Sequence, residues 1–153
     1  MSLVEERIVK MGLVLPEAAA PAAKYLPWRR AGALIYVAGQ LPSLNGELLY
    51  KGKLGDTLAV EDGYKAARLV ALNLLAQVKA AVGDLDKVRA VKLNGFVNSA
   101  PDFTAQPQVI NGASELLVDL MGDAGYHARA AVGVASLPFG VGVEIDAIFE
   151  LVD

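Results

Sequence analysis

The sequence contains no cysteine and one histidine, and both shortages narrow the kinds of site that it can build. Without cysteine, disulfide bonds, thiolate zinc sites and a cysteine nucleophile are excluded. A single histidine, His127, gives little support to a histidine-based metal site or to a serine–histidine–aspartate triad. Any functional site therefore has to depend mainly on other residue types.

A basic excess is also missing. The chain carries 14 basic and 17 acidic residues, a net charge of −3, whereas nucleic-acid-binding domains usually show a basic patch or stripe. The densest basic stretch is Trp28-Arg29-Arg30, which we interpret as a solvated loop whose tryptophan packs locally. Nucleic acid is therefore not an expected partner.

Long hydrophobic runs are absent as well, although 54% of the residues are hydrophobic. No run reaches the roughly 20 residues that a membrane-spanning helix needs. Residues 1–7 lack the basic and apolar regions of a signal peptide, so we expect a cytoplasmic protein without membrane contact. A chain this apolar has surface to cover beyond its own core, which favours oligomerisation.

The length of 153 residues suits a single domain over 1–153. We divide it into an N-terminal helix and extended arm over 1–26 and a core over 27–153. Amphipathic spacing predicts that the helix covers residues 2–12. Prolines and alanines predict an extended segment over 14–26.

Apolar residues at spacings of three and four predict two longer helices in the core, each followed by a glycine. The helices are expected over 60–82 and 105–121, and strands over 33–41, 88–98, 129–136 and 142–151, with a hairpin turn at Asn45-Gly46. Two helices of this length suit one face of a single sheet, so we expect an α+β fold. The other face then needs a cover, and the cover we expect is another copy of the chain.

The last two strands carry two charged residues in apolar surroundings. Alternation in 142–151 places Val143 and Ile145 toward the helices and Glu144 on the other face. In 129–136, the residues that share a face with Arg129 are all small, which leaves room for a ligand or a close-packed neighbour. We therefore predict that Arg129 and Glu144 share the helix-free face in adjacent strands, joined across residues 137–140. On spacing alone, we favour a structural ion pair, across the two strands or across a subunit interface, over a functional site.

Three blocks of sequence resemble the YjgF/RidA family, whose members have also been called endoribonuclease L-PSP and translation initiation inhibitor. The blocks read YVAGQLP, GFVNSAPDFTAQPQVINGAS and HARAAVGVASLPFGVGVEIDAIFEL, and they occur in the expected order. The resemblance covers residues 24–150 and is closer to the long form of the family, which has an extra N-terminal helix. It implies a chorismate-mutase-like α+β fold and a homotrimer whose sheets form a central β-barrel, with ligand pockets in the clefts between subunits.

The resemblance also implies an activity, the hydrolysis of reactive 2-imino or enamine acids to 2-oxo acids and ammonia, with no metal or organic cofactor. Arg129 matches the arginine that holds the substrate carboxylate, which its planar fork suits. Glu144 matches the glutamate that positions the attacking water. Tyr25 matches a pocket-lining tyrosine, Gly39 a backbone position beside the ligand, and Ala131 a position where active members often have cysteine, whose role is through the backbone carbonyl.

Two positions depart from the family pattern. Ala38 replaces a common serine, and Pro107 stands at the position of a pocket asparagine, with Asn111 one helical turn further on. These losses leave open a non-catalytic protein of the same fold that binds small carboxylates such as 2-oxo acids. An endoribonuclease acting as a translation inhibitor is a further alternative, against which the net charge argues. His127 is expected on the same face as Arg129, either as a proton donor or as an ordinary polar residue.

Overall fold

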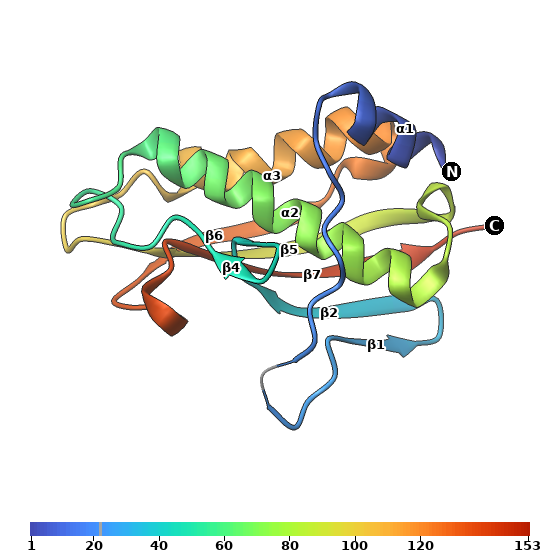
Figure 1. Cartoon of the computed structure of the whole chain (residues 1–153), viewed down its shortest axis with the longest axis horizontal. Helices are drawn as coiled ribbons and strands as arrows, with labels where there is room; N and C mark the ends of the chain where they lie inside the picture. Colours follow the sequence, from blue (N-terminus) through green and yellow to red (C-terminus); the bar gives the residue numbers. More distant parts are fainter. Residues whose placement is uncertain (22) are drawn as a thin grey trace.

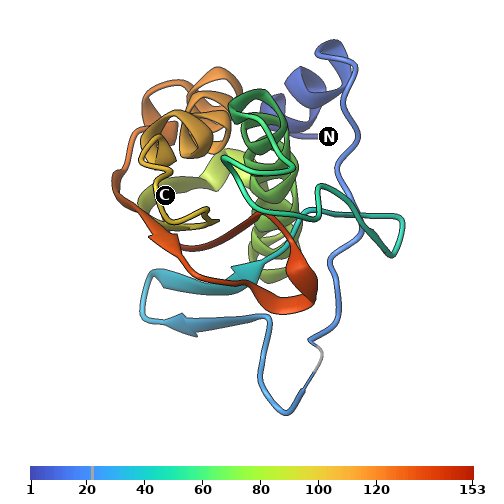
Figure 2. The ribbon, with the colours of Figure 1, turned by 90° about the vertical axis from the view of Figure 1, so that its left-hand side faces the viewer.

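A five-stranded sheet with two long helices on one face forms the body of the protein in a computed structural model, which describes residues 1–21 and 23–153 (Figure 1). The elements are α1 (Leu3–Lys10), β1 (Trp28–Ala31), β2 (Leu34–Gln40), β3 (Ser43–Leu44), β4 (Glu47–Leu48), α2 (Val60–Val82), β5 (Val88–Asn98), α3 (Gln106–Met121), β6 (Ala128–Val134) and β7 (Val143–Leu151). Seen end-on, α2 and α3 lie on the same side of the sheet, and none of the described helices covers the opposite side (Figure 2). The predicted α+β architecture is confirmed.

The two long helices occupy the ranges that their apolar spacing predicts. Gly83 adopts a φ of +83° and ends α2, and Gly122, with a φ of +61°, ends α3. Where the helices cross, a Cβ on Gly112 would lie 3.2 Å from Tyr64 Cα and nearer still to the Tyr64 carbonyl. The close packing of α2 against α3 therefore requires a glycine at this point.

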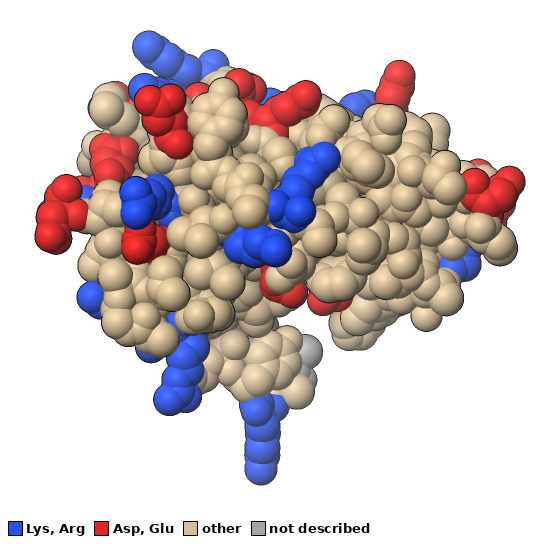
Figure 3. All heavy atoms as spheres, turned by 180° about the vertical axis from the view of Figure 1, so that it is seen from behind, with Lys and Arg blue, Asp and Glu red and all other residues tan. Residues whose placement is uncertain are grey.

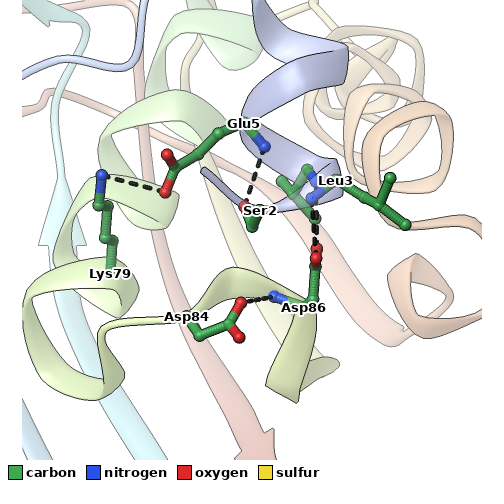
Figure 4. A network of polar contacts seen from close by, with 7 residues as sticks. Ser2, Leu3, Glu5, Lys79, Asp84 and Asp86 are labelled. Atoms are coloured by element: carbon green, nitrogen blue, oxygen red, sulfur yellow. Dashed lines mark hydrogen bonds and ion pairs between the residues drawn. The ribbon is translucent and has the colours of Figure 1, made fainter.

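The predicted N-terminal helix is present as α1 and is fixed to the body by its first turn (Figure 4). Ser2 Oγ accepts a hydrogen bond of 3.1 Å from the Glu5 amide. The Asp86 carboxylate accepts from the amides of Leu3 and Val4, at 2.7 and 3.1 Å, and so satisfies donors that a helix start leaves free. The Glu5 carboxylate also pairs with Lys79 on α2 at 3.0 Å.

An extended arm follows α1 and crosses α2, as predicted for residues 14–26, of which Ala22 lies outside the described residues (Figure 1). Gln77 on α2 donates a hydrogen bond of 2.8 Å to the carbonyl of Ala19 and holds the arm in place. The arm then leads into β1, which corrects the interpretation of Trp28-Arg29-Arg30 as a loop. Gly32, with a φ of +61°, makes the turn from β1 to β2, and Trp28 packs against the core. Asn45-Gly46 joins β3 to β4 as predicted, with both residues at positive φ.

The strand order in the sheet is β1-β2-β7-β5-β6, and this order corrects the pairing predicted for the last two strands. β6 pairs in parallel with β5, to which α3 connects it, and β7 pairs antiparallel with both β2 and β5. Strand β5 therefore lies between β6 and β7. The fully apolar helix-facing side of β7 suits the centre of the sheet, whereas the small residues of β6 suit an edge that α3 approaches closely.

The prediction that Arg129 and Glu144 share one face is also wrong. Leu93 of β5 pairs with Arg129 on one side and with Ala147 on the other, and both leucine and alanine are buried under the helices. Phe96, which points to the face opposite to that of Leu93, pairs with Glu144. Arg129 thus lies on the helix-covered side of the sheet, and Glu144 lies on the helix-free side.

Small side chains in β6 explain this difference. Ala131 packs against the core below α3, so the space beside Arg129 is occupied by a helix. The larger Val132 points to the helix-free side and is 46% exposed.

Among the described helices, none is long and apolar enough to cross a membrane.

Candidate functional site

A cavity of about 800 Å³ lies beside β2 and β7 and contains three of the five residues predicted for the site. Tyr25 reaches it from the arm, Gly39 from β2 and Glu144 from β7. Phe139, in the connection between β6 and β7, also lines it and was not predicted; it is 67% exposed and has a positive φ of 58°. The cavity therefore combines one carboxylate with aromatic and backbone groups.

Gly39 is where the chain makes room for the carboxylate. The pairing of β2 with β7 shifts register between Val37 and Gln40, a bulge of the kind that often re-aims a strand beside a functional site. A Cβ at Gly39 would lie 3.0 Å from Glu144 Cδ and 3.2 Å from Glu144 Cγ, with the carboxylate oxygen Oε2 nearer still. The Glu144 carboxylate thus rests directly over the Gly39 backbone.

The environment of Glu144 favours its protonated form. Its half-buried position raises the pKa of the carboxyl, and the neighbouring negative charge of Asp146 raises that pKa further. Asp146 is itself held by Asn94 of β5, whose Nδ2 donates to Oδ1 at 2.7 Å. A carboxylate with a raised pKa is a stronger base once it is ionised, which suits a group that accepts a proton from water.

Arg129 lies in a different place, against α3. Its Nη1 donates to Ser114 Oγ at 3.0 Å, and its Nη2 donates to the carbonyl of Pro107 at 3.3 Å. A second cavity of about 410 Å³ begins here and is also lined by Asn111 and His127. The serine was not predicted, because a lone helical serine carries no signal until the register of β6 is known.

A single chain therefore carries two separate sets of candidate residues. Tyr25, Gly39 and Glu144 surround one cavity, and Arg129 lies near Ala131 on the other side of the sheet, with β5 between the two strands. The structure does not bring Arg129 and Glu144 together within one chain.

Metal-ligand groups and basic surface bands are the two other features for which charged side chains can be inspected. Within residues 1–21 and 23–153, no three histidine, aspartate or glutamate side chains are grouped as metal ligands. On the face seen from behind, lysine and arginine are scattered among uncharged and acidic residues and form no continuous basic band (Figure 3). A uniform phosphate backbone requires such a band.

Comparisons with known proteins agree with this fold. Residues 5–145 match the sequence profile of the YjgF/chorismate mutase-like family, whose description includes an endoribonuclease assignment. Protein TCP17 of Trypanosoma cruzi is 49% identical over 150 residues, which cover 97% of this chain and 94% of TCP17.

Two solved structures extend the comparison. A protein of unknown function from Agrobacterium tumefaciens is 50% identical and superposes with a TM-score of 0.93 over 97% of this chain and 92% of its own. TdcF of Escherichia coli, solved with bound serine, is 27% identical, with a TM-score of 0.61 over 90% of this chain and 93% of its own. This chain therefore belongs to the YjgF/chorismate mutase-like family, as the three sequence blocks predict.

Proposed function

We propose that the protein hydrolyses small 2-imino acids to 2-oxo acids and ammonia, in clefts between the subunits of a homotrimer. The observation that carries the proposal is the cavity in which Glu144 lies over Gly39 and beside Tyr25. It offers a half-buried carboxylate that can orient water and accept its proton. It lacks a cation for the substrate carboxylate among its described lining residues.

The missing cation is Arg129 of a neighbouring chain. Arg129 belongs to the edge strand β6, where an adjoining subunit can reach it, and it cannot reach Glu144 of its own chain. The helix-free face also exposes Tyr36 and Val132, at 45% and 46%, in a position where a covering subunit would bury them. A cyclic assembly would join the Arg129 side of one chain to the Glu144 cavity of the next.

The chemistry follows from these two halves. Arg129 forms two parallel hydrogen bonds with the carboxylate of the substrate and places its C=N carbon in the cleft. Glu144 orients a water molecule and takes one of its protons while the water oxygen bonds to that carbon. Glu144 returns this proton to the nitrogen of the tetrahedral adduct and then transfers the proton of the new hydroxyl group to the same nitrogen. As the C=O bond forms, the C–N bond breaks and ammonia leaves, so that a 2-oxo acid remains.

The serine bound to TdcF supports this substrate class. Serine combines a carboxylate with a nitrogen on the adjacent carbon, and a 2-imino acid has the same arrangement. The family resemblance of the Arg129 and Glu144 positions points the same way.

The decisive experiment is subunit complementation. An amino-acid oxidase or a pyridoxal-phosphate-dependent dehydratase generates the imino acid, and semicarbazide traps what is not hydrolysed. Arg129→Ala and Glu144→Gln should each retain only a small residual rate alone. Unfolded together and refolded as mixed assemblies, they should recover about a quarter of the wild-type rate, because each cleft has about one chance in four of combining two intact halves. No recovery, with mixed assemblies verified by native mass spectrometry, contradicts a site shared between chains.

A binding protein for 2-oxo acids is the second candidate, favoured by Ala38, which removes a hydroxyl next to Gly39. In that case calorimetry should detect binding of 2-oxobutanoate that Arg129→Ala abolishes, while the trapping assay shows no turnover.

A further inference from the structure

The cavity of about 410 Å³ on the Arg129 side contains a nucleophile and a base that imine hydrolysis does not use. Ser114 Oγ on α3 lies 2.9 Å from His127 Nε2, within hydrogen-bond distance. His127 Nδ1 lies 2.7 Å from the carbonyl oxygen of Gly125. A serine, a histidine and an acceptor behind the histidine therefore form a continuous chain.

The carbonyl decides which imidazole nitrogen carries the proton. A carbonyl oxygen can only accept, so His127 Nδ1 has to donate to Gly125. In the neutral ring Nε2 then has a free lone pair, and the Ser114 hydroxyl donates its proton to that lone pair. In serine hydrolases an aspartate orients the histidine in the same sense, and here a backbone carbonyl takes that place.

The surroundings favour a neutral histidine. Burial lowers the pKa of His127, the hydrogen bond to Gly125 opposes this shift, and the charge of Arg129 lowers the pKa further. Glu115 and Asp119 of α3 line the same cavity and are the acidic groups that face it. His127 is thus available as a base at neutral pH.

Arg129 supplies the positive charge that such a reaction needs. Its Nη1 donates to Ser114 Oγ at 3.0 Å, which stabilises negative charge developing on this oxygen or on an oxyanion next to it. The same guanidinium can hold a carboxylate on a substrate.

We propose that Ser114 and His127 form a nucleophile–base pair that hydrolyses esters of small acids bearing a free carboxylate. Ser114 Oγ bonds to the ester carbonyl carbon as its proton moves to His127 Nε2. The carbon–oxygen bond of the leaving alcohol breaks, and the alcohol takes that proton. Water then attacks the acyl-serine, His127 accepts a proton from it and returns the proton to Ser114, and the free acid leaves. All the residues belong to one chain, so this activity requires neither Glu144 nor a neighbouring subunit.

The test is covalent labelling of the intact protein with a fluorophosphonate, which reacts with activated serines. Wild type should gain one adduct, mapped by peptide mass spectrometry to Ser114. Ser114→Ala should gain none, and His127→Gln should react about 100-fold more slowly, the contribution typical of a general base. Ser136→Ala removes an exposed serine in the β6–β7 connection and should behave as wild type.

A steady-state assay tests the substrate class. Hydrolysis of 4-nitrophenyl hemisuccinate should exceed that of 4-nitrophenyl acetate, and Arg129→Ala should remove the difference. The rate should fall at low pH with a midpoint below 6.5, the ordinary pKa of histidine. Thermal melts verify that each variant is folded. The proposal is overturned by an unlabelled wild type between pH 6 and 9, by an adduct on another residue, or by equal labelling of folded His127→Gln. None of these outcomes bears on the imine assay.

Discussion

Replacing Gly39 with alanine tests whether the Glu144 carboxylate has to lie where the structure places it. The new methyl group would meet Glu144 Cδ at 3.0 Å and the carboxylate oxygen at a shorter distance. Gly39 has an ordinary backbone conformation, so the substitution introduces no strain in φ. The methyl group acts on the end of a flexible side chain, which can move aside.

The magnitude follows from that movement. The carboxylate has to retreat on the order of 1 Å, and a displacement of this size at a reacting group costs about 100-fold in rate, or about 2.7 kcal/mol of activation free energy. The folded state loses no buried contact, so the melting temperature should stay within about 1–2 °C of wild type.

The imine-trapping assay should be run as a double-mutant cycle. Gly39→Ala should lower kcat strongly in the wild-type background and have no further effect in Glu144→Gln, because the group that it displaces is already inactive. Two results would refute the idea that Gly39 leaves the space that the Glu144 carboxylate needs. One is a wild-type kcat in Gly39→Ala, and the other is a loss in the Glu144→Gln background as large as the loss in the wild-type background.

Three further predictions concern pH and stability. The raised pKa of Glu144 means that the folded state binds a proton more tightly than the unfolded chain, so ionisation of Glu144 lowers the stability of the fold as the pH rises above 4.5. Glu144→Gln should therefore melt no lower than wild type at pH 8. The imine-hydrolysis rate of wild type should fall as the pH is lowered, with a midpoint above 4.5, because Glu144 then becomes protonated. Gly112→Ala should destabilise the fold by about 1–3 kcal/mol in urea titrations, because α2 and α3 have to separate at the Tyr64 carbonyl; an unchanged midpoint contradicts the packing. Asp86→Ala should cost about 1 kcal/mol and speed hydrogen exchange in α1, whereas Asp86→Asn, which keeps an acceptor, should cost less; equal exchange rates in both variants contradict the cap.

The elements that the sequence predicts best have a clear hydrophobic periodicity together with residues that mark where the element begins and ends. The helix over 60–82 has acidic residues in its first turn and Gly83 after its end, and the structure places α2 at Val60–Val82. Strand β7 alternates buried apolar residues with partly exposed ones, most of which are acidic, so the direction of its faces was predicted correctly.

The prediction fails for β6 because alternation gives the period of a strand and does not say which set faces the core. Val132 belongs to the more apolar set of β6, yet this set lies on the helix-free side and the set of Arg129 lies under α3, so hydrophobicity alone indicates the wrong face. Its neighbour in the sheet depends on the crossover through α3, which no local pattern contains. For the same reason the residues that reach Arg129 from α3, above all Ser114, could not be found from the sequence.

The position of β7 has a consequence for how the chain acquires its structure. This last strand, Val143–Leu151, occupies the middle of the sheet and separates β2 from β5. Because β7 follows all the other strands along the chain, β1 and β2 have no partner that connects them to β5 and β6 until Val143–Leu151 has been made and has folded. Until then the edges of β2 and β5 that β7 covers are unpaired and are open to chaperones or to other nascent chains.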